Sequence, residues 1–280
     1  MAGPLGSIFL SVVVPAYNEE ARLGETLLSI RAYLESRIDP AGTGDGTPFL
    51  MGGKLSGISM PDDALTLWHG ASEIIVVDDG STDRTGEAAA EALRGRPKDR
   101  VLRRAENGGK GRAVKEGVLD SSGEFILFSD ADLSTPIAEF EKLIAGIKAG
   151  NDIVIGSRAL PESDIRRRQN RLREGMGKFF NVLVRMFVLK GIRDTQCGFK
   201  LFRRAAALDI FSRLRTDGFG FDVEALYLAR KLGYSIGQVP VVWINSPQSK
   251  VRILRSSAAM IRDLFRIRRL HRDVKGHGKA

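Results

Sequence analysis

The amino-acid sequence predicts a single α/β domain in which a mostly parallel central sheet is flanked by helices. Apolar, β-branched runs alternate along the chain with segments of helical periodicity. This alternation is typical of parallel strands joined by right-handed crossovers. Acidic or glycine-rich loops follow several expected strands, at the edge where open α/β sheets bind ligands. With 280 residues, 43% of them hydrophobic, the chain is long enough for one large core, which we expect to cover residues 8–245.

The N-terminal part of the chain begins with an expected buried strand. Residues 8–14 are apolar and β-branched, and Pro15 is expected to end the strand before an amphipathic helix that runs to about residue 36. Residues 37–72 are rich in glycine, proline and aspartate and show little periodicity. A connection of this length and composition predicts an inserted surface loop.

Two further strands are expected after the insertion. Residues 73–77 lead into the motif Asp-Asp-Gly-Ser-Thr-Asp at residues 78–83, and an alanine-rich helix then runs to about residue 94. The next strand lies near Val101 and is followed by the stretch Asn-Gly-Gly-Lys-Gly at residues 107–111 and another helix. Both polar loops therefore lie between a strand and a helix, where ligands of such folds are bound.

The central strand is predicted to begin at Phe125 and to lead into a helix. Thr135 has the side chain of a good N-cap and Pro136 that of a good first helical residue. The helix is expected over residues 136–149, and a strand over residues 152–157 follows it.

Two carboxylates, Asp130 and Asp132, end the central strand. Their spacing lets both share one hard cation, and Mg²⁺ or Mn²⁺ bound to a diphosphate prefers oxygen ligands of this kind. Taken alone, one aspartate could cap the next helix while the other is solvated, because an Asp-x-Asp pattern is short and common. The polar loops at the neighbouring strand ends favour the metal site.

Those polar loops favour a nucleotide diphosphate as the ligand. Asp78 or Asp79 could accept a hydrogen bond from a nucleobase N–H or a ribose hydroxyl, and Tyr17 could pack over a base. Lys110 and free backbone N–H groups of residues 107–111 could hold a diphosphate. Each residue could instead serve only the local fold, Asp78 as a turn residue and Tyr17 as a half-buried loop aromatic. The three loops and the acidic pair together favour nucleotide binding.

The net charge of +9 is concentrated in two regions. Residues 158–190 carry nine basic and three acidic side chains, and residues 250–280 carry ten basic and two acidic ones. Such regions favour an anionic partner, which could be a phosphate, a membrane surface or nucleic acid. A basic nucleic-acid-binding module is the remote alternative, since the chain has neither zinc-ligand spacing nor an RNP-type aromatic motif. We therefore expect no nucleic-acid partner.

Both basic regions contain apolar faces that suit a membrane surface. Residues 176–189 are too interrupted by charge to span a bilayer but could lie in the interface, and residues 250–275 predict a basic amphipathic helix. Either apolar face could instead pack on the sheet. The single cysteine, Cys197, fits a reducing compartment, and no signal peptide or membrane-spanning run is recognisable. We expect a cytoplasmic protein that is peripheral on the cytoplasmic membrane face.

Several ordered motifs give the chain a resemblance to a known family. The motif Val-Pro-Ala-Tyr-Asn-Glu-Glu at residues 14–20, the acidic motifs described above and Gly-Ser-Arg at residues 156–158 resemble those of family 2 glycosyltransferases of the GT-A fold. The stretch Lys-Gly-Ile-Arg-Asp-Thr-Gln-Cys-Gly-Phe-Lys-Leu-Phe at residues 190–202, with Phe-Asp-Val-Glu at residues 221–224, is similar to the dolichyl-phosphate β-glucosyltransferase branch. The resemblance extends from residue 8 to about residue 270.

Together with the loops above, this resemblance implies two sets of site residues. The donor nucleotide sugar and its Mg²⁺ or Mn²⁺ are expected at Pro15, Ala16, Tyr17, Glu19, Asp78, Asp79, Lys110, Asp130, Ala131 and Asp132. The acceptor phosphate and the transferred sugar are expected at Arg158, Arg173, Asp194, Gln196, Asp222 and Glu224. The resemblance also implies UDP-glucose as the donor and a polyprenyl phosphate as the acceptor.

The chemistry of glycosyl transfer agrees with these residue types. The leaving diphosphate must be neutralised, which a divalent cation does as a Lewis acid. A sugar hydroxyl needs a general base, whereas a phosphate monoester, with a second pKa of ~6, is already a dianion at neutral pH and needs only cationic groups to hold it. We therefore expect inverting transfer to a polyprenyl phosphate at a membrane surface. A soluble glycosyltransferase acting on a small phosphorylated or carboxylated acceptor is the alternative.

Overall fold

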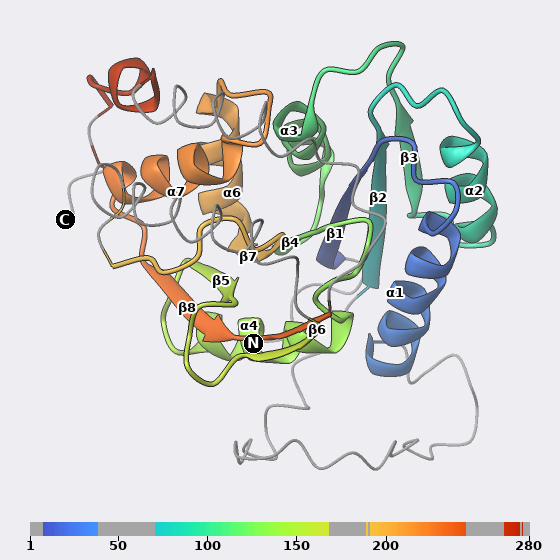
Figure 1. The fold of residues 1–280 in the computed structure, drawn as a ribbon, viewed down its shortest axis with the longest axis horizontal. Helices are drawn as coiled ribbons and strands as arrows, with labels where there is room; N and C mark the ends of the chain where they lie inside the picture. Colours follow the sequence, from blue (N-terminus) through green and yellow to red (C-terminus); the bar gives the residue numbers. More distant parts are fainter. Residues whose placement is uncertain are drawn as a thin grey trace.

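The computed structural model describes most of the chain and shows its helices arranged around a central sheet (Figure 1). The described residues are 8–38, 71–167, 189, 191–244, 266–274 and 276. Nearly all of the predicted insertion at residues 37–72, the segment 176–188 and the first part of the predicted C-terminal helix lie outside them, as does Arg173. No helix in the described ranges is long and apolar enough to cross a membrane.

The central sheet has seven strands in the order β3-β2-β1-β4-β7-β5-β8. Their bounds are Ile8–Ala16 (β1), Ala71–Asp78 (β2), Arg100–Arg103 (β3), Phe125–Ser129 (β4), Ile153–Ser157 (β5), Phe199–Arg203 (β7) and Ile236–Pro240 (β8). Only β7 is antiparallel to its neighbours, β4 and β5. The prediction of a mostly parallel sheet is therefore confirmed. Beside this sheet, β6 (Asp164–Arg167) pairs in parallel with β9 (Val242–Ile244).

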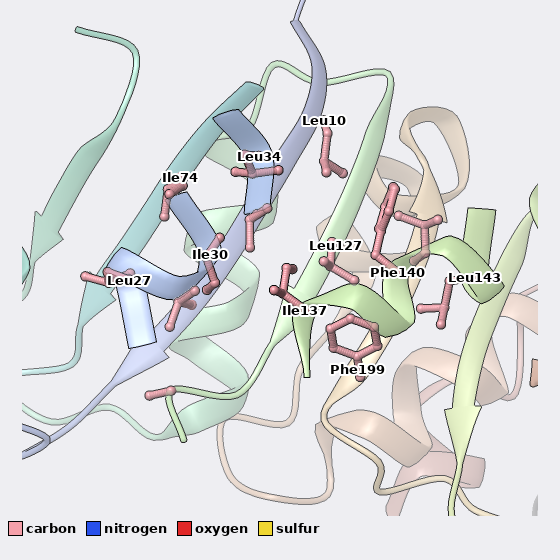
Figure 2. Close-up of a cluster of buried hydrophobic side chains, with 14 of the residues drawn as sticks. Leu10, Leu27, Ile30, Leu34, Ile74, Leu127, Ile137, Phe140, Leu143 and Phe199 are labelled. Atoms are coloured by element: carbon pink, nitrogen blue, oxygen red, sulfur yellow. The ribbon is translucent and has the colours of Figure 1, made fainter. Parts of the chain in front are cut away.

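Helices cover both faces of the sheet because successive strand residues point to opposite sides. On β1, Val12 and Val14 pack into one apolar cluster, whereas Val13 packs into another. The first cluster, part of which Figure 2 shows, joins the sheet to α1 (Leu23–Ile38), α2 (Thr85–Ala92) and α4 (Phe140–Lys148). The second joins it to α3 (Lys110–Asp120), α6 (Arg204–Arg213) and α7 (Phe221–Leu232). Three layers result, with the sheet in the middle.

Two local expectations differ from the structure. β1 continues through Pro15, which pairs with Val77, instead of ending before it. β4 pairs with β1 only from Leu10 to Val13, so the proline lies beyond the two-sided part of the ladder, where its missing N–H is tolerated.

The predicted helix over residues 136–149 is divided. A 3₁₀ turn at Ile137–Glu139 precedes α4, and Pro136 has a non-helical ψ of 144°. Thr135 makes no N-cap hydrogen bond. Its hydroxyl instead lies 3.8 Å from the Cys197 sulfur, because β7 brings that residue beside the end of β4.

Candidate active site

The acidic pair lies just beyond the last residue of β4, in the position that the sequence pattern predicts. Asp132 Oδ1 accepts the Ser134 N–H at 3.0 Å. Ala131, between the two aspartates, is buried, and its carbonyl accepts the Thr26 hydroxyl at 2.8 Å. Anchoring of the intervening residue leaves the carboxylates of Asp130 and Asp132 at the carboxyl edge of the sheet, where ligands of open α/β sheets bind.

The carboxylate oxygens of Asp130 and Asp132 fit a divalent cation. Oδ1 of Asp130 is buried, and its contact with the Lys110 ammonium at 2.7 Å is an ion pair without hydrogen-bond geometry. The described residues hold no group of three or more His, Cys, Asp or Glu side chains suited to a metal. A cation at Asp130 and Asp132 would therefore take its other ligands from substrate oxygens and water, as Mg²⁺ does when it binds phosphates.

Gly198, directly before β7, allows a close approach to Asp130. The Asp130 N–H donates to the Gly198 carbonyl at 3.0 Å. A Cβ at residue 198 would lie 1.9 Å from Asp130 Oδ2. The carboxylate can keep its place only because residue 198 has no side chain.

Gly198→Ala is expected to displace the Asp130 carboxylate, since the carboxylate rotates more easily than the strand backbone moves. We expect metal-dependent activity to fall roughly tenfold or more, because small misplacements of reacting groups are costly. Activity as a function of Mn²⁺ concentration, together with Tm, measures the effect. Gly24→Ala is the matched control, because a Cβ there meets nothing within 4 Å. An unchanged Mn²⁺ requirement in Gly198→Ala would contradict the prediction.

The glycine-rich loop before α3 is held by Asp79. The N–H groups of Gly108 and Gly109 donate to the two Asp79 carboxylate oxygens at 3.0 and 2.8 Å. The Arg104 guanidinium lies 3.3 Å from the same carboxylate, which is 3% exposed. Asp79 therefore fixes the loop from the β2 side.

The other end of the loop is held by the segment before α7. The N–H groups of Gly111 and Arg112 donate to the Asp217 carbonyl at 2.7 and 3.2 Å. The expectation that residues 107–111 offer free N–H groups to a diphosphate is wrong for Gly108, Gly109 and Gly111, because these three N–H groups already bind neighbouring segments.

Lys110, the first residue of α3, extends from this loop to the acidic pair. Its ammonium contacts Asp130 and lies 5.4 Å from the Phe128 ring and 5.8 Å from the Phe219 ring. Burial opposes its charge, but Asp130 and Asp222 outweigh burial and raise the pKa of Lys110. A charged ammonium beside Asp130 is well placed for a diphosphate.

Asp78 and Asp79 have different surroundings. Asp78 Oδ1 accepts the Ser81 N–H at 3.1 Å, so the structure places Asp78 in the turn role that the sequence left open. The Asp79 N–H donates to the Ala16 carbonyl at 2.9 Å, which joins the ends of β1 and β2. A direct contact between Asp79 and a nucleobase stays a prediction.

Asp79→Ala is expected to raise the Kd of UDP roughly tenfold or more, since it removes a charged acceptor of hydrogen bonds. The chemical step should change less, because a contact made equally in ground and transition states affects binding alone. Calorimetric titration of UDP measures the effect. Glu87→Gln, at an exposed carboxylate on α2, is the control. An unchanged Kd would limit Asp79 to organising the local fold.

The segment after β1 presents an aromatic ring and an ion pair. Tyr17 is 44% exposed, so its ring is available to a base. The Glu19 carboxylate is bound by the Arg22 guanidinium at 2.5 Å. Burial opposes the charge of Arg22, but Glu19, Asp132 and Asp130 outweigh it and raise the pKa of Arg22. Sequence reasoning missed Arg22, although its spacing of three residues from Glu19 is a helical pairing signal.

Arg158, which follows β5, and Asp194 lie together. The guanidinium donates to Asp194 from Nε at 2.7 Å and from Nη2 at 2.9 Å, and the Arg158 and Gln196 N–H groups donate to the same carboxylate. The guanidinium also lies 5.6 Å from the Trp243 ring. Burial favours the neutral acid, but Arg158 outweighs it and holds the pKa of Asp194 below its usual range. Arg173, the other predicted acceptor arginine, lies outside the described residues.

Asp222, in the first turn of α7, is paired with a lysine that sequence reasoning missed. Lys200 Nζ donates to Asp222 Oδ1 at 2.6 Å and to the Cys197 carbonyl at 2.5 Å. Burial raises the pKa of Asp222, against the opposing effect of Lys200 and Lys110. A charged residue inside the apolar stretch Phe-Lys-Leu-Phe at residues 199–202 is the signal that could have revealed it.

The contacts of Glu224 are with residues other than the acidic pair. Its carboxylate accepts the N–H groups of Arg215 and Thr216 at 2.9 and 2.7 Å and lies 2.5 Å from His271 Nε2. His271 is 2% exposed. The buried His271 therefore docks the C-terminal segment on α7.

The sequence profile of glycosyl transferase family 2 matches residues 62–211 of the chain. The chain belongs to glycosyltransferase family 2. This glycosyltransferase is 37% identical to the dolichyl-phosphate β-glucosyltransferase of Dictyostelium discoideum, over 95% of the chain and 75% of that protein. It is 38% identical to the enzyme of the same name from Homo sapiens, over 92% of the chain and 74% of that protein.

Solved structures place this family 2 glycosyltransferase in the GT-A fold. Mannosyl-3-phosphoglycerate synthase from Rubrobacter xylanophilus aligns with a TM-score of 0.64 at 19% identity, over 96% of the chain and 76% of that protein. Glucosyl-3-phosphoglycerate synthase from Mycobacterium tuberculosis, in complex with Mn²⁺, UDP-glucose and phosphoglyceric acid, aligns with a TM-score of 0.61 at 20% identity, over 93% and 78%. The fold predicted from the sequence is confirmed.

Proposed function

We propose that this glycosyltransferase transfers glucose from UDP-glucose to dolichyl phosphate or a similar polyprenyl phosphate, with inversion at the anomeric carbon. The observation that carries the proposal is an identity of 37 to 39% with dolichyl-phosphate β-glucosyltransferases of three organisms, over more than nine-tenths of the chain. The contacts around the acidic pair and Arg158 support it independently.

We assign donor binding to the ends of β1, β2 and β4. Tyr17 offers its exposed ring to uracil. The Asp79 N–H donates to the carbonyl of Ala16, the residue before Tyr17. Asp130 and Asp132 would hold Mg²⁺ or Mn²⁺, which when bound would supply Lewis-acid neutralisation of the leaving diphosphate. Lys110 adds a fixed positive charge beside the same carboxylates. The similarly folded mycobacterial synthase was solved with Mn²⁺ and UDP-glucose bound, which supports this assignment.

The three carboxylates predicted to lie near the acceptor are all bound by other groups of the protein. Asp194 is bound by Arg158, Asp222 by Lys200, and Glu224 by two backbone N–H groups and a histidine. None of them is left as an unpaired general base, which a sugar hydroxyl would require. A phosphate dianion requires no base, so these pairings support a phosphate acceptor.

We assign Arg158 to the acceptor phosphate. Asp194 occupies Nε and Nη2 of its guanidinium, which leaves Nη1 without a hydrogen bond among the described residues and directs it away from the pair. In the reaction, a phosphate oxygen attacks the anomeric carbon, the new oxygen–carbon bond forms, and the bond to UDP breaks on the opposite face. An α-linked donor therefore gives a β-linked product.

A polyprenyl acceptor implies that the reaction takes place at a membrane surface. The basic segments 158–190 and 250–280 support a peripheral association with the cytoplasmic face, because clustered Lys and Arg are attracted to anionic lipid. Co-sedimentation with anionic and with neutral vesicles measures this association directly.

The function is tested by incubating the protein with radiolabelled UDP-glucose, Mn²⁺ or Mg²⁺, and dolichyl phosphate, followed by organic extraction. We expect label in the organic phase that depends on both the cation and the lipid phosphate. Parallel reactions contain 3-phosphoglycerate in place of the lipid. Label that enters only the water-soluble product would contradict the lipid acceptor and favour a small phosphorylated acceptor.

A further inference from the structure

Lys200 is a buried lysine in the middle of β7, where an apolar residue would be expected. It pairs across the sheet with Phe128 on β4 and Ile155 on β5 and is 1% exposed. Its ammonium lies 5.6 Å from the Phe128 ring. Burial of a lysine is unfavourable unless it is paired and hydrogen-bonded.

The ammonium of Lys200 joins two segments that are distant in the sequence. One N–H of the ammonium donates to Asp222 Oδ1 in α7, and another donates to the Cys197 carbonyl in the loop before β7. Replacement of a buried ion pair by apolar side chains of similar volume is often neutral for stability. Stability alone therefore does not explain a lysine at this position.

The loop held by Lys200 contacts both halves of the candidate active site. Gly198 packs against the Asp130 carboxylate and accepts its N–H. On the other side, Asp194 binds the Arg158 guanidinium through two nitrogens. The carbonyl of Cys197 lies between these two contacts in the chain.

We propose that Lys200 is a positioning residue, whose ammonium fixes residues 194–198 by binding the Cys197 carbonyl. Through that loop it holds Asp130 on the donor side and Arg158 on the acceptor side at a constant separation. Lys200 itself touches neither substrate. This proposal rests on the proposed function, which assigns one side of the site to the donor and the other to the acceptor. The hydrogen bonds that it explains can be measured without any substrate.

Two variants separate this role from that of an ordinary buried ion pair. Lys200→Met and Asp222→Asn both remove the Lys200–Asp222 ion pair, but only Lys200→Met removes the donor to the Cys197 carbonyl. The matched control is Lys142→Met on the other face of the sheet. Lys142 is also paired, at 2.7 Å, with a largely buried carboxylate, that of Glu139.

The first readout is hydrogen–deuterium exchange of the Arg158 and Gln196 N–H groups, which both donate to Asp194. We expect both to lose protection in Lys200→Met and to keep it in Asp222→Asn and Lys142→Met. The second readout is kcat, which we expect to fall roughly ten- to a hundredfold in Lys200→Met with little change in the KM for UDP-glucose, as for a misplaced but still bound donor.

Equal loss of protection in Lys200→Met and Asp222→Asn would overturn the proposal, because the ion pair alone would then hold the loop. Retained protection in Lys200→Met would also overturn it. If the wild-type protein transfers no glucose to dolichyl phosphate, the proposed function fails, and the exchange measurement still decides the role of Lys200.

Discussion

Asp132→Asn is expected to reduce turnover by about a hundredfold or more while the fold is retained. Loss of one carboxylate weakens the hold on a cation that contributes several kcal/mol of charge stabilisation in the transition state. The fold should persist because the side chain is partly exposed and an asparagine Oδ1 can still accept the Ser134 N–H. Steady-state transfer to dolichyl phosphate and Tm measure the two effects.

The same dependence should appear when the cation is removed. EDTA should abolish activity of the wild-type protein, and excess Mn²⁺ or Mg²⁺ should restore it. Glu87→Gln is the control for Asp132→Asn, since the Glu87 carboxylate is 54% exposed on α2 and pairs with the side chain of Arg103 at 2.9 Å. Full activity in EDTA would show that Asp130 and Asp132 serve no metal.

Arg158→Lys is expected to lower kcat/KM for the acceptor about ten- to a hundredfold. Lysine keeps the charge but loses the planar fork that binds Asp194 through two nitrogens and, in our proposal, leaves a third for phosphate. The loss of one charge-assisted hydrogen bond, about 1.5–3 kcal/mol, corresponds to that range. Lysine is preferred to alanine here, because alanine would leave the buried Asp194 without its cation.

The Kd of UDP should change little in Arg158→Lys, since the donor diphosphate is assigned to the metal and Lys110. Arg31→Lys is a matched control: its side chain is 29% exposed, as is that of Arg158, and pairs with Glu35 on α1. Arg173→Lys tests the second predicted arginine in the same way. Lost donor binding with normal acceptor kinetics would move Arg158 to the nucleotide site.

Local sequence patterns predicted the acidic pair and most of the strands. The apolar run from Phe125 indicates a strand, and the two aspartates after it indicate where that strand ends. The bounds of β5 agree closely with the predicted strand over residues 152–157. Residue alternation and strand-end chemistry are local properties, so a single sequence reveals them.

The antiparallel direction of β7 could not be predicted from local patterns. Its apolar residues from Phe199 to Phe202 fit a buried strand of either direction, and direction depends on which strands the segment meets. The structure places it between β4 and β5. That placement brings Gly198 against Asp130 and turns the Thr135 hydroxyl away from its predicted N-cap role.

By itself the sequence determined the α/β class, the carboxylates at the end of β4 and the excess of positive charge, because each depends on residues that are close together in the chain. Only the tertiary structure decided how the charges pair. Arg158 binds Asp194 across 36 residues, Asp79 holds Gly109 across 30, and Lys200 reaches Asp222 across 22. These partners share no local pattern, because their pairing follows from the order of the strands in the folded sheet.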